Sequence, residues 1–384
     1  MVEPSEPSGE PTFVMMLDEG GRFTSRSVPL AEIRPSLART MISLIRFVIA
    51  AHFIRLLSIV AVGAAAACTR ATPVRSAPSG DRTRLFEFHS DFWVNLHHFL
   101  YVTARARAGL DATRTAVTSA LSDTAGFGTL SRAQQDAWNR ALVYYGRAVA
   151  SRDILFDSSL VDVNDRLAEV ETATTVGGAA NLDPEIAAAL DRAAPVYRAL
   201  WWPRHDASNR RWTARAVAVL AEHGDAAARA EAAVFHHPWP WTPVRVDVSA
   251  YANWAGAYTT ENPSHVNVRS TDTPPNDGAT IFETLFHEVL HTMDDSLFAV
   301  LRTSFRASGK RWPRDPTHLF IFYTAGEVTR RLFPGHVPFA EQVGMWTRNP
   351  DFARMLPLLR AHWQPRLDGR GSLEEAMRRI ADGW

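Results

Sequence analysis

The residues best suited to chemistry in this chain are two histidines and a glutamate in the order His-Glu-x-x-His, namely His287, Glu288 and His291. Residues four apart share one face of an α-helix, so the two imidazoles can bind one metal ion, at about 2.0 to 2.1 Å for zinc. Glu288 then lies beside the open coordination position. Zinc lowers the pKa of its water from about 15.7 to 7, and a carboxylate can accept that proton and deliver it to a leaving amine. The spacing therefore favours metal-assisted hydrolysis.

A chance match and a plain surface helix are the alternatives to a metal site. The chain has 14 histidines in 384 residues, and we expect an accidental motif of this length in roughly a few per cent of such chains. The flanks favour a helix, because Thr280 to Glu283 has the pattern of a capping box and Ile281 and Leu285 form an apolar pair one turn apart. Asn276 to Gly278 has the composition of the preceding turn.

The ten residues from Thr284 to Met293 resemble the extended motif of the zincin metallopeptidases, since every position that flanks the two histidines and the glutamate is uncharged. No Gly-x-x-His follows His291, as it would in metzincins. The pattern is therefore similar to that of gluzincins, whose third zinc ligand is a glutamate on a later helix. The resemblance is local to this segment. It implies a zinc peptidase acting on peptides or proteins, with Glu288 as general base.

A second helix offers a candidate for the third ligand. Asp315 and Pro316 form a helix start, with aspartate as N-cap and proline at the first helical position. The residues that follow are apolar nearly all round, which is typical of a buried helix, and a buried carboxylate is costly unless it is paired or metal-bound. Glu327 is the carboxylate in this helix beyond its first turn. We predict Glu327 as the third ligand, with Gly326 allowing close approach of a neighbouring helix or of the metal.

Other assignments for these positions stay open. Glu327 could instead pair with one of three arginines in the core, Arg302, Arg330 or Arg331. Asp294 and Asp295 follow His291 by three and four residues and could bind the metal or orient a ligand imidazole. His318 and Glu341 are weaker candidates for the third ligand.

Two residues could stabilise the oxyanion of a tetrahedral intermediate. Tyr323 lies one turn before Glu327 on the same helix face, and His336 lies in the turn after this helix. The sequence does not separate the two, and a tyrosine at such a position is more often a core residue.

The residues before the motif alternate in polarity as strands do. Val244 to Val248 and Ser264 to Ser270 both have period two. An extended peptide could pair with the free edge of the second strand, which would hold the scissile bond over the metal. His236 to Trp241 contains two adjacent histidines, but their side chains diverge, and we interpret the segment as a packed turn.

The predicted fold class is α+β, mainly α, with a helical N-terminal region (84–235) packed on a zincin-like catalytic region (236–384) that contains a small antiparallel sheet and the motif helix. The chain is 46% hydrophobic with zero net charge, so it has enough apolar residues for a large core and gives no electrostatic reason to expect nucleic acid. Helical periodicity predicts six helices beside those at the motif, at 91–107, 131–151, 183–199, 211–233, 352–362 and 372–381.

The single cysteine ends a segment that resembles a bacterial lipoprotein signal. Residues 41–67 contain two arginines and then an apolar run that ends in four alanines before Cys68. The uncharged stretch of 14 residues, 56–69, is short for a transmembrane helix of about 20 residues. We expect lipidation at Cys68, a tether at 68–83 and a location in the bacterial envelope. Residues 1–40 read as an unstructured extension before a natural start at Met41.

Two other classes of function fit the same sequence. One is a non-catalytic envelope protein that keeps the fold to bind peptides or cell-wall components. The other is a zinc hydrolase of a non-peptide amide. Glu288 favours catalysis, because metal binding needs only the ligands whereas hydrolysis also needs a base.

Overall fold

The computed structural model describes residues 82–110, 123, 126–240, 243–260, 265–271 and 277–384, and the backbone of two strands nearer the N-terminus. The chain divides into two units, Met1–Arg75 and Ser76–Trp384. In the first unit, β1 (Thr12–Leu17) pairs antiparallel with β2 (Phe23–Val28). This hairpin lies where the sequence indicated no regular structure. Cys68, the predicted signal (41–67) and the tether up to residue 81 lie outside the described residues.

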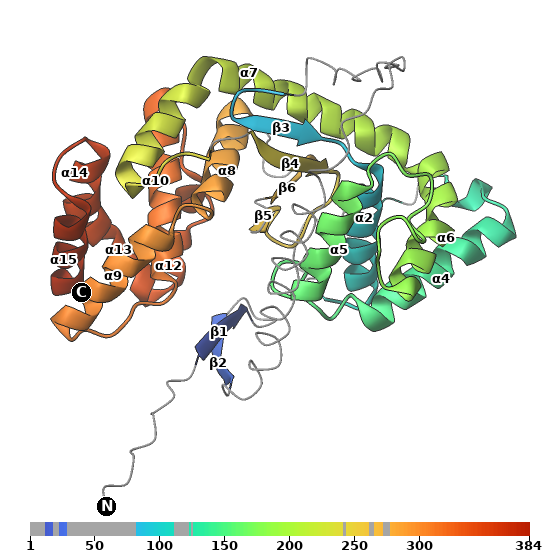
Figure 1. The fold of residues 1–384 in the computed structure, drawn as a ribbon, viewed down its shortest axis with the longest axis horizontal. Helices are drawn as coiled ribbons and strands as arrows, with labels where there is room; N and C mark the ends of the chain where they lie inside the picture. The colour runs from blue at the N-terminus through green and yellow to red at the C-terminus, as the bar shows by residue number, and fades with distance from the viewer. Residues whose placement is uncertain are drawn as a thin grey trace, which may run out of the picture. The chain divides into compact units, whose positions relative to one another are not determined.

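A four-stranded sheet lies at the middle of the second unit in the order β3-β4-β6-β5 (Figure 1). Three strands are mutually parallel and β5 runs antiparallel to β6. The expected antiparallel sheet is therefore wrong: the sheet is mixed, because helices connect β3 to β4 and only β5 and β6 form a hairpin. The strands are β3 (Phe86–His89), β4 (Val244–Ser249), β5 (Ala257–Thr260) and β6 (His265–Arg269).

Both strands predicted from alternation, β4 and β6, are present. The other two strands, each four residues long, are too short to show a period in the sequence. The position of β3 matters for the domain division, because a strand from the predicted helical region pairs with β4. The sheet thus joins the two predicted regions, and residues 76–384 form one compact unit.

The helices between β3 and β4 build the first of two hydrophobic cores. Each of the four helices predicted in this region is present, and α7 begins nine residues earlier than expected. Two histidines on α2 are buried. His97 Nδ1 lies 2.8 Å from the Tyr145 hydroxyl, and His98 contacts the Val94 backbone oxygen and the Tyr258 hydroxyl through its two ring nitrogens, at 2.8 and 2.7 Å. These elements are α2 (Phe92–Arg107), η1 (Phe127–Thr129), α4 (Arg132–Ala148), α5 (Ser158–Glu169), α6 (Pro184–Leu200) and α7 (Trp202–Phe235).

The second core lies between the sheet and the C-terminal helices. The long helix α7 contacts both α6 and α8 and so bridges the two cores (Figure 1). The C-terminal elements are α8 (Gly278–Leu290), α9 (Asp295–Ser308), α10 (Pro316–Leu332), α11 (Phe339–Gln342), α12 (Met345–Arg348), α13 (Pro350–Leu358), the π-helical turn η2 (Leu359–Trp363), α14 (Gln364–Leu367) and α15 (Leu373–Gly383). The fold class is therefore α+β and mainly α, as predicted.

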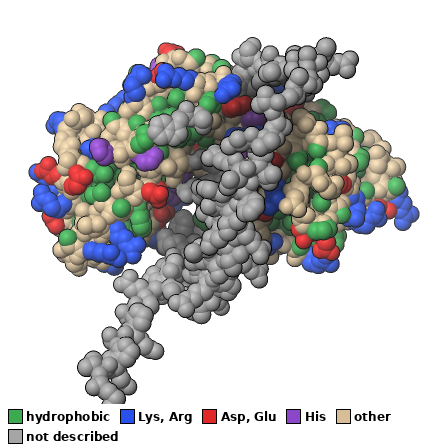
Figure 2. All heavy atoms as spheres, viewed as in Figure 1, with side chains coloured by type: hydrophobic (Ala, Val, Ile, Leu, Met, Phe, Trp, Pro, Cys, Tyr) green, Lys and Arg blue, Asp and Glu red, His purple; other side chains and the backbone are tan. Residues whose placement is uncertain are grey.

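Basic and acidic side chains are interspersed over the face shown in Figure 2, in keeping with the zero net charge. Among the described residues, no helix combines the length and apolar character needed to cross a membrane.

Candidate metal centre

Asp277 is the N-cap of the motif helix α8, and its carboxylate accepts a hydrogen bond from the Thr280 backbone N–H at 2.7 Å. The predicted capping box from Thr280 to Glu283 is wrong, and the helix starts one turn earlier. Phe282 and Phe286 stack at 4.4 Å between ring centroids and are buried in the second core. This apolar face fixes the rotation of the helix, so that the histidines point to the opposite side, toward α10.

Three histidines converge at this place. His291 Nε2 and His318 Nε2 each lie 3.3 Å from His287 Nε2. The three rings are almost equally spaced, with centroids 5.1, 5.2 and 5.0 Å apart. One nitrogen from each ring lies within 4.8 Å of the others, an arrangement that could hold a metal ion.

The spacing fits a small tetrahedral ion. With metal–nitrogen distances of about 2.05 Å, neighbouring ligand atoms of a tetrahedron are about 3.3 Å apart, which is the separation observed for two of the three pairs. A metal ion at the centre of the cluster could contact one nitrogen of each ring at the same time. His287 is buried, whereas 31% of the His318 side chain is exposed, so a ligand from solvent can approach from the side of α10.

The electrostatic surroundings keep two of the imidazoles neutral, as metal ligands must be. Burial, followed by the neighbouring His291 and His318, lowers the pKa of His287 well below its ordinary value. Burial and His318 lower the pKa of His291 to about 3. Burial also acts to lower the pKa of His318, but the charges of Asp315 and Glu288 outweigh it and raise that pKa.

The third histidine comes from the first turn of α10, where Pro316 occupies the first helical position as predicted. Glu327, the predicted ligand, follows His318 by nine residues on the same helix, which separates their backbones by about 13 Å. The Glu327 carboxylate instead lies 3.4 Å from Arg330, and its side chain is 18% exposed. The prediction of Glu327 as a ligand assumes a deeply buried carboxylate without a charged partner, whereas this carboxylate is partly exposed and lies beside Arg330. Among the described residues, His318 and not Glu327 joins His287 and His291 in the group that could hold a metal ion.

Glu288, the predicted general base, lies beside the three histidines. The Thr259 hydroxyl on β5 lies 2.8 Å from Glu288 Oε2 and 2.9 Å from the Glu288 backbone oxygen. Burial raises the pKa of Glu288 to about 7, although the hydrogen bond from Thr259 opposes the rise. No local pattern in the sequence marks Thr259, because its role comes from the packing of β5 on α8.

The two candidates for oxyanion stabilisation have other partners. The Tyr323 hydroxyl donates to Gln364 Oε1 at 2.6 Å, and the side chain is buried in the second core. His336 Nε2 lies 2.6 Å from the carboxylate of Glu283, one turn before His287 on α8. The structure therefore brings neither of them into the histidine cluster.

Gly326 allows two segments to approach, as predicted. A Cβ at this position would lie 2.7 Å from Pro338 Cβ and 3.3 Å from Glu283 Oε1. The absence of a side chain thus lets α10 pack against α8 and the segment before α11. The predicted alternative, approach to a metal, is not what the glycine serves.

The three remaining acidic candidates, Asp294, Asp295 and Glu341, lie outside the described group of possible metal ligands. Asp294 precedes α9, and its charge is among those that raise the pKa of His318 against the lowering effect of burial. Asp295 is exposed in the first turn of α9. Glu341 accepts a hydrogen bond from Arg330 at 2.6 Å. The described cluster of possible ligands contains none of these three.

The edge strand of the sheet differs from the one predicted. β6 is an inner strand between β4 and β5, whereas β5 pairs with β6 alone among the described strands. The edge strand that contacts the motif helix α8 is therefore β5, the strand that carries Thr259. His236 and His237 lie at the end of α7, where His237 Nδ1 contacts the Pro238 backbone oxygen at 2.8 Å, as expected of a turn.

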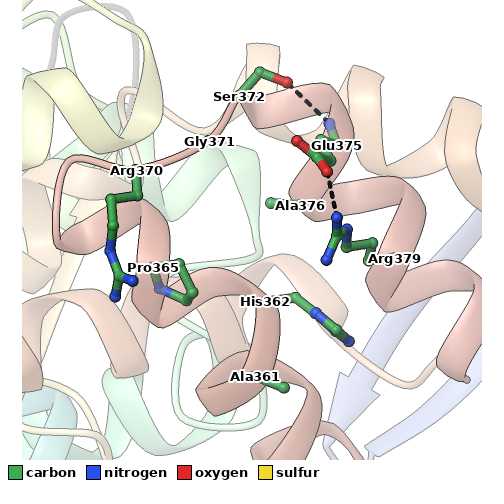
Figure 3. Close-up of a pocket in the computed structure, with 9 residues that line it drawn as sticks. All are labelled: Ala361, His362, Pro365, Arg370, Gly371, Ser372, Glu375, Ala376 and Arg379. Atoms are coloured by element: carbon green, nitrogen blue, oxygen red, sulfur yellow. Dashed lines mark hydrogen bonds and ion pairs between the residues drawn. The ribbon is translucent and has the colours of Figure 1, made fainter.

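A surface hollow of about 180 Å³ lies elsewhere, among η2, α14 and α15 (Figure 3). Its charged and polar groups are partly satisfied by one another, because Arg379 pairs with Glu375 at 2.5 Å and Ser372 caps α15 by accepting from the Glu375 N–H. None of the three clustered histidines lines this hollow. The chemistry indicated by the sequence therefore lies at α8 and α10.

Comparisons of the chain with protein-family models, with curated proteins and with solved structures found no match.

Proposed function

We propose that this protein is a zinc-dependent metallopeptidase, with His287, His291 and His318 as metal ligands and Glu288 as general base. The observation that carries the proposal is the convergence of three imidazole nitrogens, two of the pairs at 3.3 Å, next to a buried carboxylate. Three protein ligands leave a fourth position open, which is typical of catalytic zinc and not of structural zinc. The chain supplies nitrogen ligands alone, a set that suits zinc among several transition metals.

When bound, zinc would lower the pKa of water and polarise a carbonyl group. The chain's own residues supply the proton transfer. Glu288 has its pKa raised to about 7, chiefly by burial, and a base transfers protons best when its pKa is near the working pH. Thr259 holds one carboxylate oxygen through its hydroxyl, which leaves the other oxygen of Glu288 to accept a proton and pass it to the leaving amine.

The edge of β5 supports a peptide as the substrate. Gly256 O accepts a hydrogen bond from the Arg269 N–H at 2.8 Å, so Gly256 faces β6. Backbone polar groups alternate sides along a strand, and those of Ala257 and Thr259 therefore face away from β6. An extended peptide that paired there would lie beside Glu288, held by main-chain hydrogen bonds that do not depend on its sequence.

We also propose that the enzyme is anchored to the bacterial envelope by a lipid on Cys68. The support is the sequence alone, in the apolar run and small residues that precede the cysteine. Such an anchor would confine the enzyme to peptides or proteins at the membrane surface.

Two alternatives remain to be separated by experiment: a binding protein without activity and a hydrolase of non-peptide amides. Zinc content and turnover of a peptide library should be measured for the wild type and for Glu288→Gln. We expect one bound zinc in both proteins and a loss of about 10² to 10⁴ in turnover for the variant. Zinc in both with no turnover in either would support the binding protein, and turnover of simple amides but not of peptides would support the other hydrolase.

A further inference from the structure

Asp315, the N-cap residue of α10, has a left-handed backbone conformation, which a helix N-cap does not need. Its φ and ψ are 45° and 49°, in the left-handed region, which residues other than glycine rarely adopt and which aspartate tolerates better than most. Asp315 precedes Pro316 as the N-cap of α10, yet among the described residues its carboxylate accepts no capping hydrogen bond from the helix. The side chain therefore has another partner.

That partner is a proposed metal ligand. Asp315 Oδ2 lies 3.1 Å from His318 Nδ1, while His318 Nε2 faces His287 Nε2 at 3.3 Å. A carboxylate on one ring nitrogen holds the proton there, which fixes the tautomer and directs the lone pair of the other nitrogen toward a metal. The left-handed turn brings the carboxylate back over the first turn of α10, where it can reach the ring.

We infer that Asp315 is a positioning residue, which holds His318 in the orientation and tautomer that complete the metal centre. The inference rests on the proposed metal centre but not on the proposed peptidase reaction. This positioning role explains the conformation of Asp315. A carboxylate that capped α10 would accept from the N–H groups of the first turn, whereas the carboxylate of Asp315 contacts the imidazole of His318.

The chain contains a matched control for a role in starting a helix. Asp183 and Pro184 begin α6 with the same Asp-Pro pair, and Asp183 Oδ1 accepts from the Glu185 and Ile186 N–H groups at 2.9 and 3.3 Å. Asp183 therefore caps its helix through its carboxylate, and it is distant in sequence from the three clustered histidines. A variant at Asp183 therefore reports the loss of a cap without the loss of a contact to His318.

The test is the affinity for Zn²⁺, measured in competition with a chromophoric chelator, together with the melting temperature of the metal-free protein. For Asp315→Gly we expect the Kd for Zn²⁺ to rise by about 10- to 100-fold. The metal-free variant should melt at the same or a higher temperature, because glycine adopts the left-handed conformation without strain. Asp183→Gly should lower the melting temperature and leave the Kd unchanged.

Asp315→Asn supplies a graded comparison, since its amide oxygen can still accept from Nδ1–H but carries no charge. Its Kd should fall between those of the wild type and Asp315→Gly, and it decides the matter if the glycine variant does not fold. Zinc affinity equal to that of the wild type in both Asp315 variants would overturn the inference. The Kd for Zn²⁺ should increase from the wild type to Asp315→Asn to Asp315→Gly. If this order is found in a protein that hydrolyses no peptide, the role of Asp315 is supported and the proposed peptidase reaction is overturned.

Discussion

His318 Nε2 lies 3.3 Å from His287 Nε2, although 31 positions separate the two residues in the chain. The contact joins the first turn of α10 to the last turn of α8. With this contact, His318 joins the two histidines of α8 in a cluster of three. The cluster lies beside Glu288, whose carboxylate accepts a hydrogen bond from Thr259 on the edge strand β5. The proposed activity depends on this junction of α8, α10 and β5.

We expect the hydrogen bond from Thr259 to help set the pKa of Glu288, the proposed general base. Thr259→Val keeps the side-chain shape but removes the hydroxyl that lies 2.8 Å from Glu288 Oε2. The hydrogen bond lowers the pKa of Glu288 against the raising effect of burial, so its loss should raise that pKa further. The acid limb of kcat/KM, measured against pH on a peptide substrate, should therefore move to higher pH. Thr260→Val, on the same strand, should leave the limb in place, and equal shifts in both variants would count against a specific role for Thr259.

Stability should fall as the pH rises through the titration of His265. Burial lowers the pKa of His265, but the charge of Asp247 and the hydrogen bond with Asp165 outweigh it and raise that pKa to about 9. Because the folded-state pKa exceeds the unfolded value of about 6.5, the stabilisation is complete below pH 6.5 and is lost as the pH rises through 9.

The free energy of unfolding, measured in urea between pH 6 and 10, should therefore decrease by a few kcal/mol, on the order of 3. The double variant His265→Gln, Asp247→Asn removes both charges together and should show a flatter profile. An equally steep decrease in the double variant would mean that another group causes it.

Gly326→Ala should destabilise the protein. The added Cβ would lie 2.7 Å from Pro338 Cβ, and overpacking of this kind costs about 1 to 3 kcal/mol. Gly146→Ala is the matched control, because Gly146 is exposed on α4 with nothing within 4 Å of an added Cβ. That change should stabilise the helix by about 0.5 to 1 kcal/mol. The melting temperature should fall for Gly326→Ala and rise for Gly146→Ala. An unchanged melting temperature for Gly326→Ala would show that the segment before α11 can shift to make room for the added Cβ.

Cys68→Ser should release the protein from membranes if the cysteine carries a lipid. The thiol is the only one in the chain, so no other cysteine can replace it. Fractionation of cells that express each form should find the wild type with membranes and the variant in the soluble fraction. A variant that stays with the membranes would refute lipidation at this residue.

The local part of the site could be predicted from the sequence because it depends on helix geometry alone. His287, Glu288 and His291 lie within five consecutive residues, so their shared face follows from the helix repeat. The strands β4 and β6 and the helices around the motif follow from hydrophobic period in the same way.

The third ligand could not be predicted, because it depends on how α10 packs against α8. The apolar helix around Glu327 predicts a deeply buried carboxylate, but in the structure Arg330 and solvent reach this carboxylate. From the sequence, His318 is a weaker candidate because it lies in the opening turn of its helix. In the structure, that first turn of α10 is the part that contacts the motif histidines. The mixed order of the sheet also escaped prediction, since β3 comes from a region whose composition indicated helices alone.

The most direct test of the three-histidine centre is the zinc content of two variants of α10, His318→Ala and Glu327→Ala, measured by elemental analysis after dialysis against a trace of Zn²⁺. The wild type and Glu327→Ala should each retain about one zinc per chain, and His318→Ala should lose most of it, since a ligand is missing. Full zinc occupancy in His318→Ala, together with its loss in Glu327→Ala, would contradict the account and restore the glutamate as the third ligand.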